Sequence, residues 1–189
     1  MRVVAFVLAA LVAIVSPLAA HPVAIDTHSS TMTVNVHKKG LFSFLADDHA
    51  IEAPIANGEY DADASSADIV VDAAALKVLD PKLSADKRAQ VQSAMVSSKV
   101  LDVERYPKIE FRSTKIEHTG RKLKITGNLS LHGQTHPIVV TADEVDATHF
   151  TGSATIRQTQ FGITPIKIGG GAVSVRDDVE VEFRIALAG

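Results

Sequence analysis

The sequence predicts an all-β protein, in which an eight-stranded antiparallel sheet curls into a barrel with one accompanying helix. Three observations predict this fold. Apolar and polar residues alternate with a period of two over most of the chain after residue 30, which is typical of strands with one face on a core and the other in water. Turn residues fall in the gaps between the alternating runs, and a single stretch departs to helical spacing.

Length and composition limit the class of protein before any element is placed. The chain has 189 residues, 22 acidic and 19 basic, with a formal net charge of -3, so we expect one domain and no nucleic-acid partner. It contains no Cys, which excludes disulfides, thiolate catalysis and thiolate metal sites.

The first twenty residues have the pattern of a secretion signal. Arg2 is the only charged residue before Asp26, and an apolar run from Val3 to Val15 is followed by small residues up to Ala20. This run is shorter than the roughly 20 apolar residues that a spanning helix needs. We therefore expect a signal peptide over 1–20, a mature domain over 21–189 and no stable membrane insertion.

The mature chain contains eight segments with strand periodicity. The clearest are Lys122–Leu131 and Val179–Ile185, in which apolar residues or Gly occupy every second position. The predicted strands are 30–37, 49–57, 66–73, 108–118, 121–131, 136–144, 148–158 and 175–187.

One stretch, 84–98, interrupts the strands with apolar residues at helical spacing. Ser84 is a suitable N-cap, Asp86 suits the positive end of the helix dipole, and Pro81 and Pro107 bracket the segment. We therefore expect one helix between the third and fourth strands.

A single sheet with one apolar face must bury that face, either by closing into a barrel or by splitting into a sandwich. Gly127 and Gly152 lie inside long predicted strands and favour curling, because Gly permits sharp bends. An eight-stranded barrel is just wide enough for its own side chains or for one small ligand. Because the inward face is apolar, any ligand in the interior should be apolar too.

Three segments carry a resemblance to a known family. They are Leu101–Ser113 (LDVERYPKIEFRS), Ile125–Pro137 (ITGNLSLHGQTHP), and Gln158–Ile163 (QTQFGI) closed by the alternating acids of Asp178–Glu182. Over roughly residues 25–187 the chain resembles the YceI-like family of periplasmic, polyisoprenoid-binding proteins. The resemblance implies a lipocalin-like barrel with a helix beside it, a periplasmic location and a long isoprenoid chain held in the interior.

These expectations define a binding site in a carrier that is not an enzyme. We expect the lining to include Phe111, Leu129, Leu131, Val181 and Phe183, with Phe42, Phe44 and Phe161 at the mouth. An anionic head group would need a cation near the rim, and Arg157 or Lys167 could supply it. We predict no catalytic residue and no cofactor other than a bound isoprenoid lipid.

Two alternative functions remain open. The chain has eight His residues, but a metal site needs ligands that converge in space, and neither the His132–His136 pair nor His21 at the expected mature N-terminus guarantees that. Asp48 and His49 have no identifiable nucleophile beside them. We therefore predict no metal ligand. The first alternative function is a His-dependent metal or redox-linked envelope protein. The second is a packed barrel that acts as a stress or interaction module. A homodimer is also left open.

Overall fold

The computed structural model describes residues 22–39, 48–168 and 173–189 of the chain. The strands and helices of these residues are β1 (Val23–Ala24), β2 (Thr31–Val36), β3 (Lys38–Lys39), β4 (His49–Glu52), β5 (Ile55–Asp61), β6 (Ser66–Asp72), η2 (Ala73–Ala75), β7 (Lys77–Val78), α1 (Ala85–Val96), β8 (Lys108–Thr119), β9 (Lys122–Leu131), β10 (Gln134–Glu144), β11 (His149–Arg157), η3 (Gln158–Phe161), β12 (Lys167–Ile168), β13 (Val173–Val175) and β14 (Asp178–Ala186). None of the helices formed by these residues is long and apolar enough to cross a membrane.

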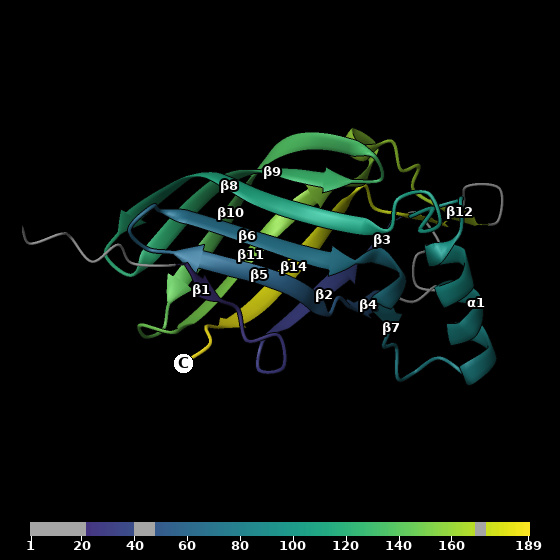
Figure 1. Ribbon diagram of the computed structural model, residues 1–189. Coiled ribbons are helices and arrows are strands. Elements are labelled where there is room, and N and C mark those ends of the chain that lie inside the picture. Colours follow the sequence, from purple (N-terminus) through teal and green to yellow (C-terminus); the bar gives the residue numbers. More distant parts are fainter. Residues whose placement is uncertain (1–21, 40–47, 169–172) are drawn as a thin grey trace, which may run out of the picture.

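The main feature of the fold is one curled antiparallel sheet (Figure 1). Its eleven strands follow the order β1-β5-β6-β8-β9-β10-β11-β14-β2-β4-β7. β4 pairs with β2 near one end of this order, and β5 pairs with β6 near the other, although only Ala53 and Pro54 separate β4 from β5 along the chain. Beyond β1, Ile25 also bridges to Leu187, just after β14. The sheet therefore curls around an interior, and its β1 end approaches β14.

The predicted all-β class with one helix is confirmed, but the predicted count of eight strands is not. The predicted strand 49–57 divides into β4 and β5, and Pro54 in the break cannot donate a ladder hydrogen bond. The two-residue strands β1 and β7 add pairings at the edges of the sheet. Each of these two is too short to carry a recognisable alternation.

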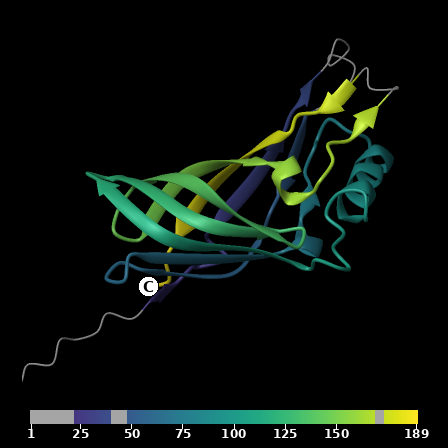
Figure 2. The ribbon, with the colours of Figure 1, turned by 90° about the horizontal axis from the view of Figure 1, so that it is seen from above.

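The predicted helix is confirmed as α1, with Ser84 as its N-cap. The Ser84 hydroxyl accepts a hydrogen bond from the Lys87 backbone N–H at 3.4 Å. α1 lies beside one end of the curled sheet, and a second, three-stranded sheet of β12, β13 and β3 lies at the same end (Figure 2). The sequence did not predict this small sheet.

The core follows the period-two pattern of the strands. In β9, Leu123, Leu129 and Leu131 are buried, whereas the alternate residues Lys122 and Lys124 are exposed. The inner face of the sheet is therefore apolar and its outer face is polar, as expected for an antiparallel sheet with one solvated face.

Candidate apolar ligand cavity

The interior of the curled sheet holds a cavity of about 250 Å³. Its walls are inward-facing side chains from nearly every strand of the main sheet. Five predicted lining residues, Phe111, Leu129, Leu131, Val181 and Phe183, are among them. A packed barrel would fill this space with its own side chains, so the cavity counts against the packed-barrel alternative.

Two glycines leave space on the cavity wall for aromatic rings of neighbouring strands. A Cβ at Gly127 would lie under 3.0 Å from the Phe111 ring, and a Cβ at Gly152 would lie equally close to the Phe183 ring. Gly152 faces Phe183 directly in the β11–β14 ladder. Each ring therefore occupies the space that a side chain at the glycine would take, and it lies against the wall of the cavity.

The end of the cavity nearest the β5–β6 turn is crossed by aromatic side chains. The ring centroids of Tyr60 on β5 and Phe150 on β11 lie 5.3 Å apart. Both residues line the cavity. Burial, reinforced by the carboxylates of Glu144 and Asp61, raises the pKa of the Tyr60 phenol, so the phenol is uncharged at neutral pH.

The opposite end is covered by the segment between β6 and β8, which contains η2, β7 and α1. Met95 of α1 and Leu101 after it line the cavity. The Gln92 side-chain amide fastens α1 to the edge of the sheet, because it accepts from the Val78 N–H at 2.9 Å and donates to the Leu76 carbonyl at 2.8 Å. These bonds satisfy backbone groups that an edge strand would otherwise leave unpaired.

Polar groups are scarce in the lining. Among the described residues it includes Glu59, Tyr60 and Gln158 but no Lys or Arg. The Gln158 side-chain amide donates to the Arg176 carbonyl at 2.9 Å. An anionic group buried here would be without a counterion, and the nearly complete apolar lining suits apolar ligands.

The predicted head-group and mouth residues lie away from this lining or outside the described chain. Arg157 is exposed, and its Nε lies 3.4 Å from Asp178 Oδ1 and 4.0 Å from Asp177 Oδ2. Lys167 on β12 is also exposed. Phe161 is fully buried in a cluster with Leu129, Leu131 and Ile163. Phe42 and Phe44 lie outside the described residues.

The three segments that carry the family resemblance meet in space. The Tyr106 ring of the first lies 4.8 Å from the His132 ring of the second, and His132 Nδ1 lies 3.1 Å from the Phe161 carbonyl oxygen of the third. Gly133 has a positive φ of 73°, and a Cβ there would overlap the Tyr106 ring. These motif residues therefore support one another beside the buried Leu129–Leu131 wall.

Several histidines of the described segments contact carboxylates or the backbone. His49 Nδ1 lies 2.5 Å from Oδ2 of the buried Asp80, and His37 Nδ1 lies 3.3 Å from Asp48 Oδ2. Within the described parts of the chain, no three His, Asp or Glu side chains gather as a metal site would require. The metal alternative therefore gains no support from these residues.

Two aromatic residues of the cavity, Tyr60 and Phe150, were missed by sequence reasoning. Tyr60 lies beyond the end of the predicted strand 49–57, although β5 continues to Asp61. Phe150 lies in a predicted strand and follows its alternation. Extending the second predicted strand would have placed Tyr60 in the sheet, but no local pattern indicates that its ring meets Phe150.

Comparisons with known proteins identify the family and agree with the fold. A family model described as YceI-like domain matches residues 24–187. A UPF0312 protein of Pseudomonas savastanoi pv. phaseolicola is 37% identical over 99 residues, which cover 47% of this chain and 50% of that protein. The chain therefore matches about half the length of this relative.

Two solved structures have a similar fold. BcnA of Burkholderia cenocepacia has a TM-score of 0.59 at 21% identity, with 87% of this chain and 99% of that chain covered. A polyisoprenoid binding domain from Saccharophagus degradans, implicated in plant cell wall breakdown, has a TM-score of 0.62 at 13% identity, with 89% and 99% covered. At these identities the similarity concerns the fold.

Proposed function

The chain belongs to the YceI-like domain family, and we propose that it is a non-enzymatic carrier that holds a long apolar chain of the isoprenoid class inside its curled sheet. The observation that carries this proposal is the cavity of about 250 Å³, whose lining is almost entirely apolar. The polyisoprenoid-binding description of the Saccharophagus degradans domain supports the choice of ligand class.

Binding in such a site is driven by burial. Each CH₂ group removed from water contributes roughly 0.8 kcal/mol, so a prenyl chain binds without a directed polar contact. The curled sheet supplies a preformed apolar space, which lowers the entropic cost of ordering the chain.

The head group is uncharged or stays outside the lumen. The described lining has no Lys or Arg, and an anionic head group without a counterion would be costly to bury there. Arg157 and Lys167 are exposed, so any contact that they make with a head group takes place at the surface. Arg157 would also have to leave its contact with Asp178.

The carrier acts in the periplasm after export. The apolar run and the small residues within 1–20 support cleavage after Ala20. A water-soluble carrier there would move an isoprenoid lipid through an aqueous compartment in which the free lipid is insoluble.

The test is extraction of lipid from the exported protein. The protein is purified without detergent, extracted with organic solvent and analysed by mass spectrometry, and prenol binding is measured on the extracted protein. We expect an isoprenoid lipid in the extract and saturable prenol binding with a stoichiometry near one. The absence of both would contradict the proposal.

A further inference from the structure

The contact between Tyr60 and Phe150 spans the interior of the curled sheet. Along the ladder, β5 and β11 are five strand steps apart in one direction, and β1 and β14 separate them in the other. Neighbouring strands lie about 4.8 Å apart, so ring centroids at 5.3 Å cannot meet along the wall. The two rings meet across the lumen.

Apolar side chains from the remaining strands complete this barrier. Ile116 of β8, Leu123 of β9 and Ala142 of β10 form a buried cluster, against which both rings pack. The barrier therefore draws on strands around the circumference and closes one end of the cavity.

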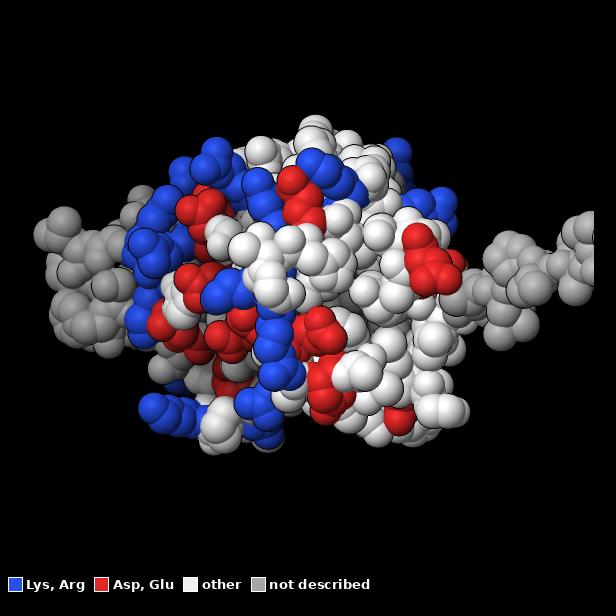
Figure 3. Space-filling model, turned by 90° about the vertical axis from the view of Figure 1, so that its left-hand side faces the viewer, with Lys and Arg blue, Asp and Glu red and all other residues white. Residues whose placement is uncertain are grey.

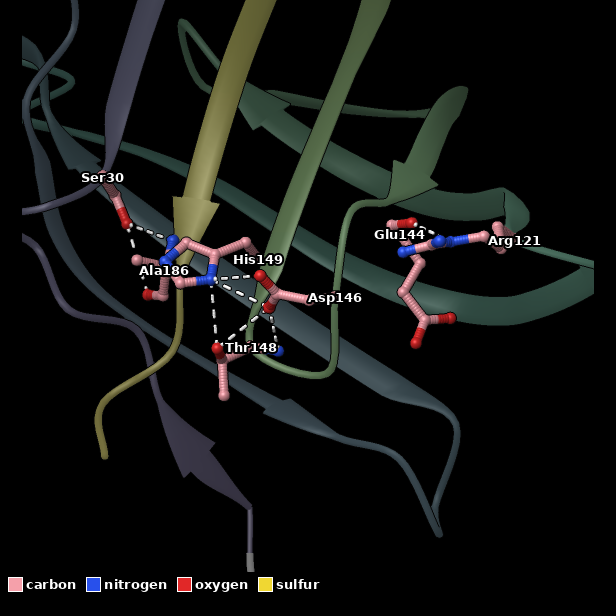
Figure 4. Close-up of polar contacts among 7 residues, drawn as sticks. All are labelled: Ser30, Arg121, Glu144, Asp146, Thr148, His149 and Ala186. Carbon is pink, nitrogen blue, oxygen red and sulfur yellow. Dashed lines mark hydrogen bonds and ion pairs between the residues drawn. The ribbon is translucent and has the colours of Figure 1, made fainter.

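The backbone that carries each ring is held firmly. Tyr60 is paired with Val23 of β1. Phe150 follows the β10–β11 turn, in which Asp146 accepts from the Thr148 N–H at 2.9 Å and lies 2.9 Å from His149 Nδ1 (Figure 4).

The outer face of this end is charged in part. Acidic and basic side chains mix over one half of it, whereas the other half is largely uncharged (Figure 3). An apolar chain that entered here would cross this surface and then have to part the two rings.

The other end of the cavity has a cover of a different kind. The segment between β6 and β8 lies over it, and Met95 is the one residue of α1 that is buried. This segment joins the edge of the sheet through β7, which pairs with β4, and the Gln92 side chain holds α1 to the same edge. A chain that enters from this side would therefore travel toward the Tyr60–Phe150 contact.

We propose that the Tyr60–Phe150 pair is the floor of the cavity and determines the longest chain that the protein accepts. The inference rests on the proposed function. A chain that reaches the floor has its last carbons against the two rings, and further carbons remain outside the lumen. Because each buried CH₂ raises affinity about fourfold, affinity rises with chain length until the floor is reached and then levels off.

The experiment measures affinities for a series of linear prenols that differ by one isoprene unit, by displacement of a fluorescent apolar probe. Phe150→Ala removes one half of the floor, and Tyr60→Leu removes the other half from the opposite wall. Tyr60→Phe is the matched control, because it keeps the ring and loses only the hydroxyl. Circular dichroism checks that each variant is folded.

We expect the parent and Tyr60→Phe to level off at the same prenol. Phe150→Ala or Tyr60→Leu should level off at least one isoprene unit later. Because that unit has five carbons, each worth about fourfold, the longer prenol should bind the variant up to roughly 1,000-fold more tightly than it binds the parent. If the folded variants level off at the same length as the parent, the floor is refuted while prenol binding still supports the proposed function. If the parent binds no prenol, the proposed function fails, and the floor fails with it.

Discussion

Replacing Leu129 by Phe separates a lined cavity from a packed core. Leu129 is buried on β9, lines the cavity and faces Phe111 across the β8–β9 ladder. Phe is a better test substitution than the larger Trp, because an indole N–H without an acceptor in this lumen would itself lower stability by about 1–3 kcal/mol.

The two interpretations predict different losses of stability. In a packed core the larger ring would cost about 1–3 kcal/mol, which lowers the Tm by roughly 2–12 °C for a domain of this size. In a cavity of about 250 Å³ the ring enters open space, and we expect the Tm of the lipid-free protein to change by less than about 3 °C.

Ligand affinity should fall in Leu129→Phe, although the stability of the lipid-free protein hardly changes. Phe has three more side-chain carbons than Leu, and if they take the place of three ligand CH₂ groups, binding weakens by about 2.4 kcal/mol, or roughly 50-fold. The assays are thermal unfolding of the lipid-free protein and prenol titration. Lys124→Gln, an outward change on the same strand, is the control and should alter neither result. A large drop in Tm, or unchanged prenol affinity, would refute the placement of Leu129 on an open lumen.

Two further predictions concern stability. Gly133→Ala combines a positive φ of 73° with overlap on the Tyr106 ring, whereas Gly120→Ala has a φ of 62° in open space. We expect Gly120→Ala to cost about 1–2 kcal/mol and Gly133→Ala to cost about 1–3 kcal/mol more in urea unfolding, and equal costs would contradict the Tyr106 contact. The pKa of Asp146 is lowered to about 2 by hydrogen bonds from the Thr148 N–H and from His149. A carboxyl group with a lowered pKa stabilises the fold at pH values above its unfolded pKa of about 3.9, and this stabilisation is lost as the pH falls toward 2. Between about pH 4 and pH 2, the Tm of Asp146→Asn should therefore fall less than the Tm of the parent. Equal decreases in Tm would show that these contacts do not persist in solution.

The sequence predicted those features of the fold that repeat along the chain. Two such features are the alternation in β9 and β14 and the Ser84 cap of α1. Both are local signals, because the structure that they predict depends on hydrogen bonds and burial of residues close in sequence. The small sheet was missed because β3 and β12 have two residues each, too few for a period. The count of eight strands failed at Pro54, where the predicted strand 49–57 changes partners, and at the edges, where the two-residue strands β1 and β7 add pairings.

The lining of the cavity could be predicted as far as the direction of side chains follows from alternation. Phe111, Leu129, Leu131, Val181 and Phe183 line the cavity, because each lies on the apolar face of its strand. Residues that depend on contacts far apart in sequence escaped this reasoning.

Arg157 illustrates such a contact. It was expected near a ligand head group, but its Nε lies beside carboxylates that are 20 and 21 residues further along the chain, at Asp177 and Asp178. Phe161, expected at the mouth, is fully buried, and its ring lies 5.3 Å from the His136 ring. In both cases tertiary partners decided the position, and no local pattern identifies such partners.

The cavity depends on two pairs of residues, each a Gly inside a strand and a neighbouring Phe, and Gly at such a position is unfavourable for the stability of the strand. Gly inside a strand costs backbone entropy and gives up a packing side chain, yet Gly127 and Gly152 lie in two long strands of the sheet. Each receives the ring of a neighbouring Phe on the inner face. With larger residues at both glycines, Phe111 and Phe183 would be pushed toward the centre and would take up part of the cavity of about 250 Å³. The two Gly–Phe pairs therefore exchange local strand stability for open space, which is the exchange expected of a protein whose interior holds a ligand.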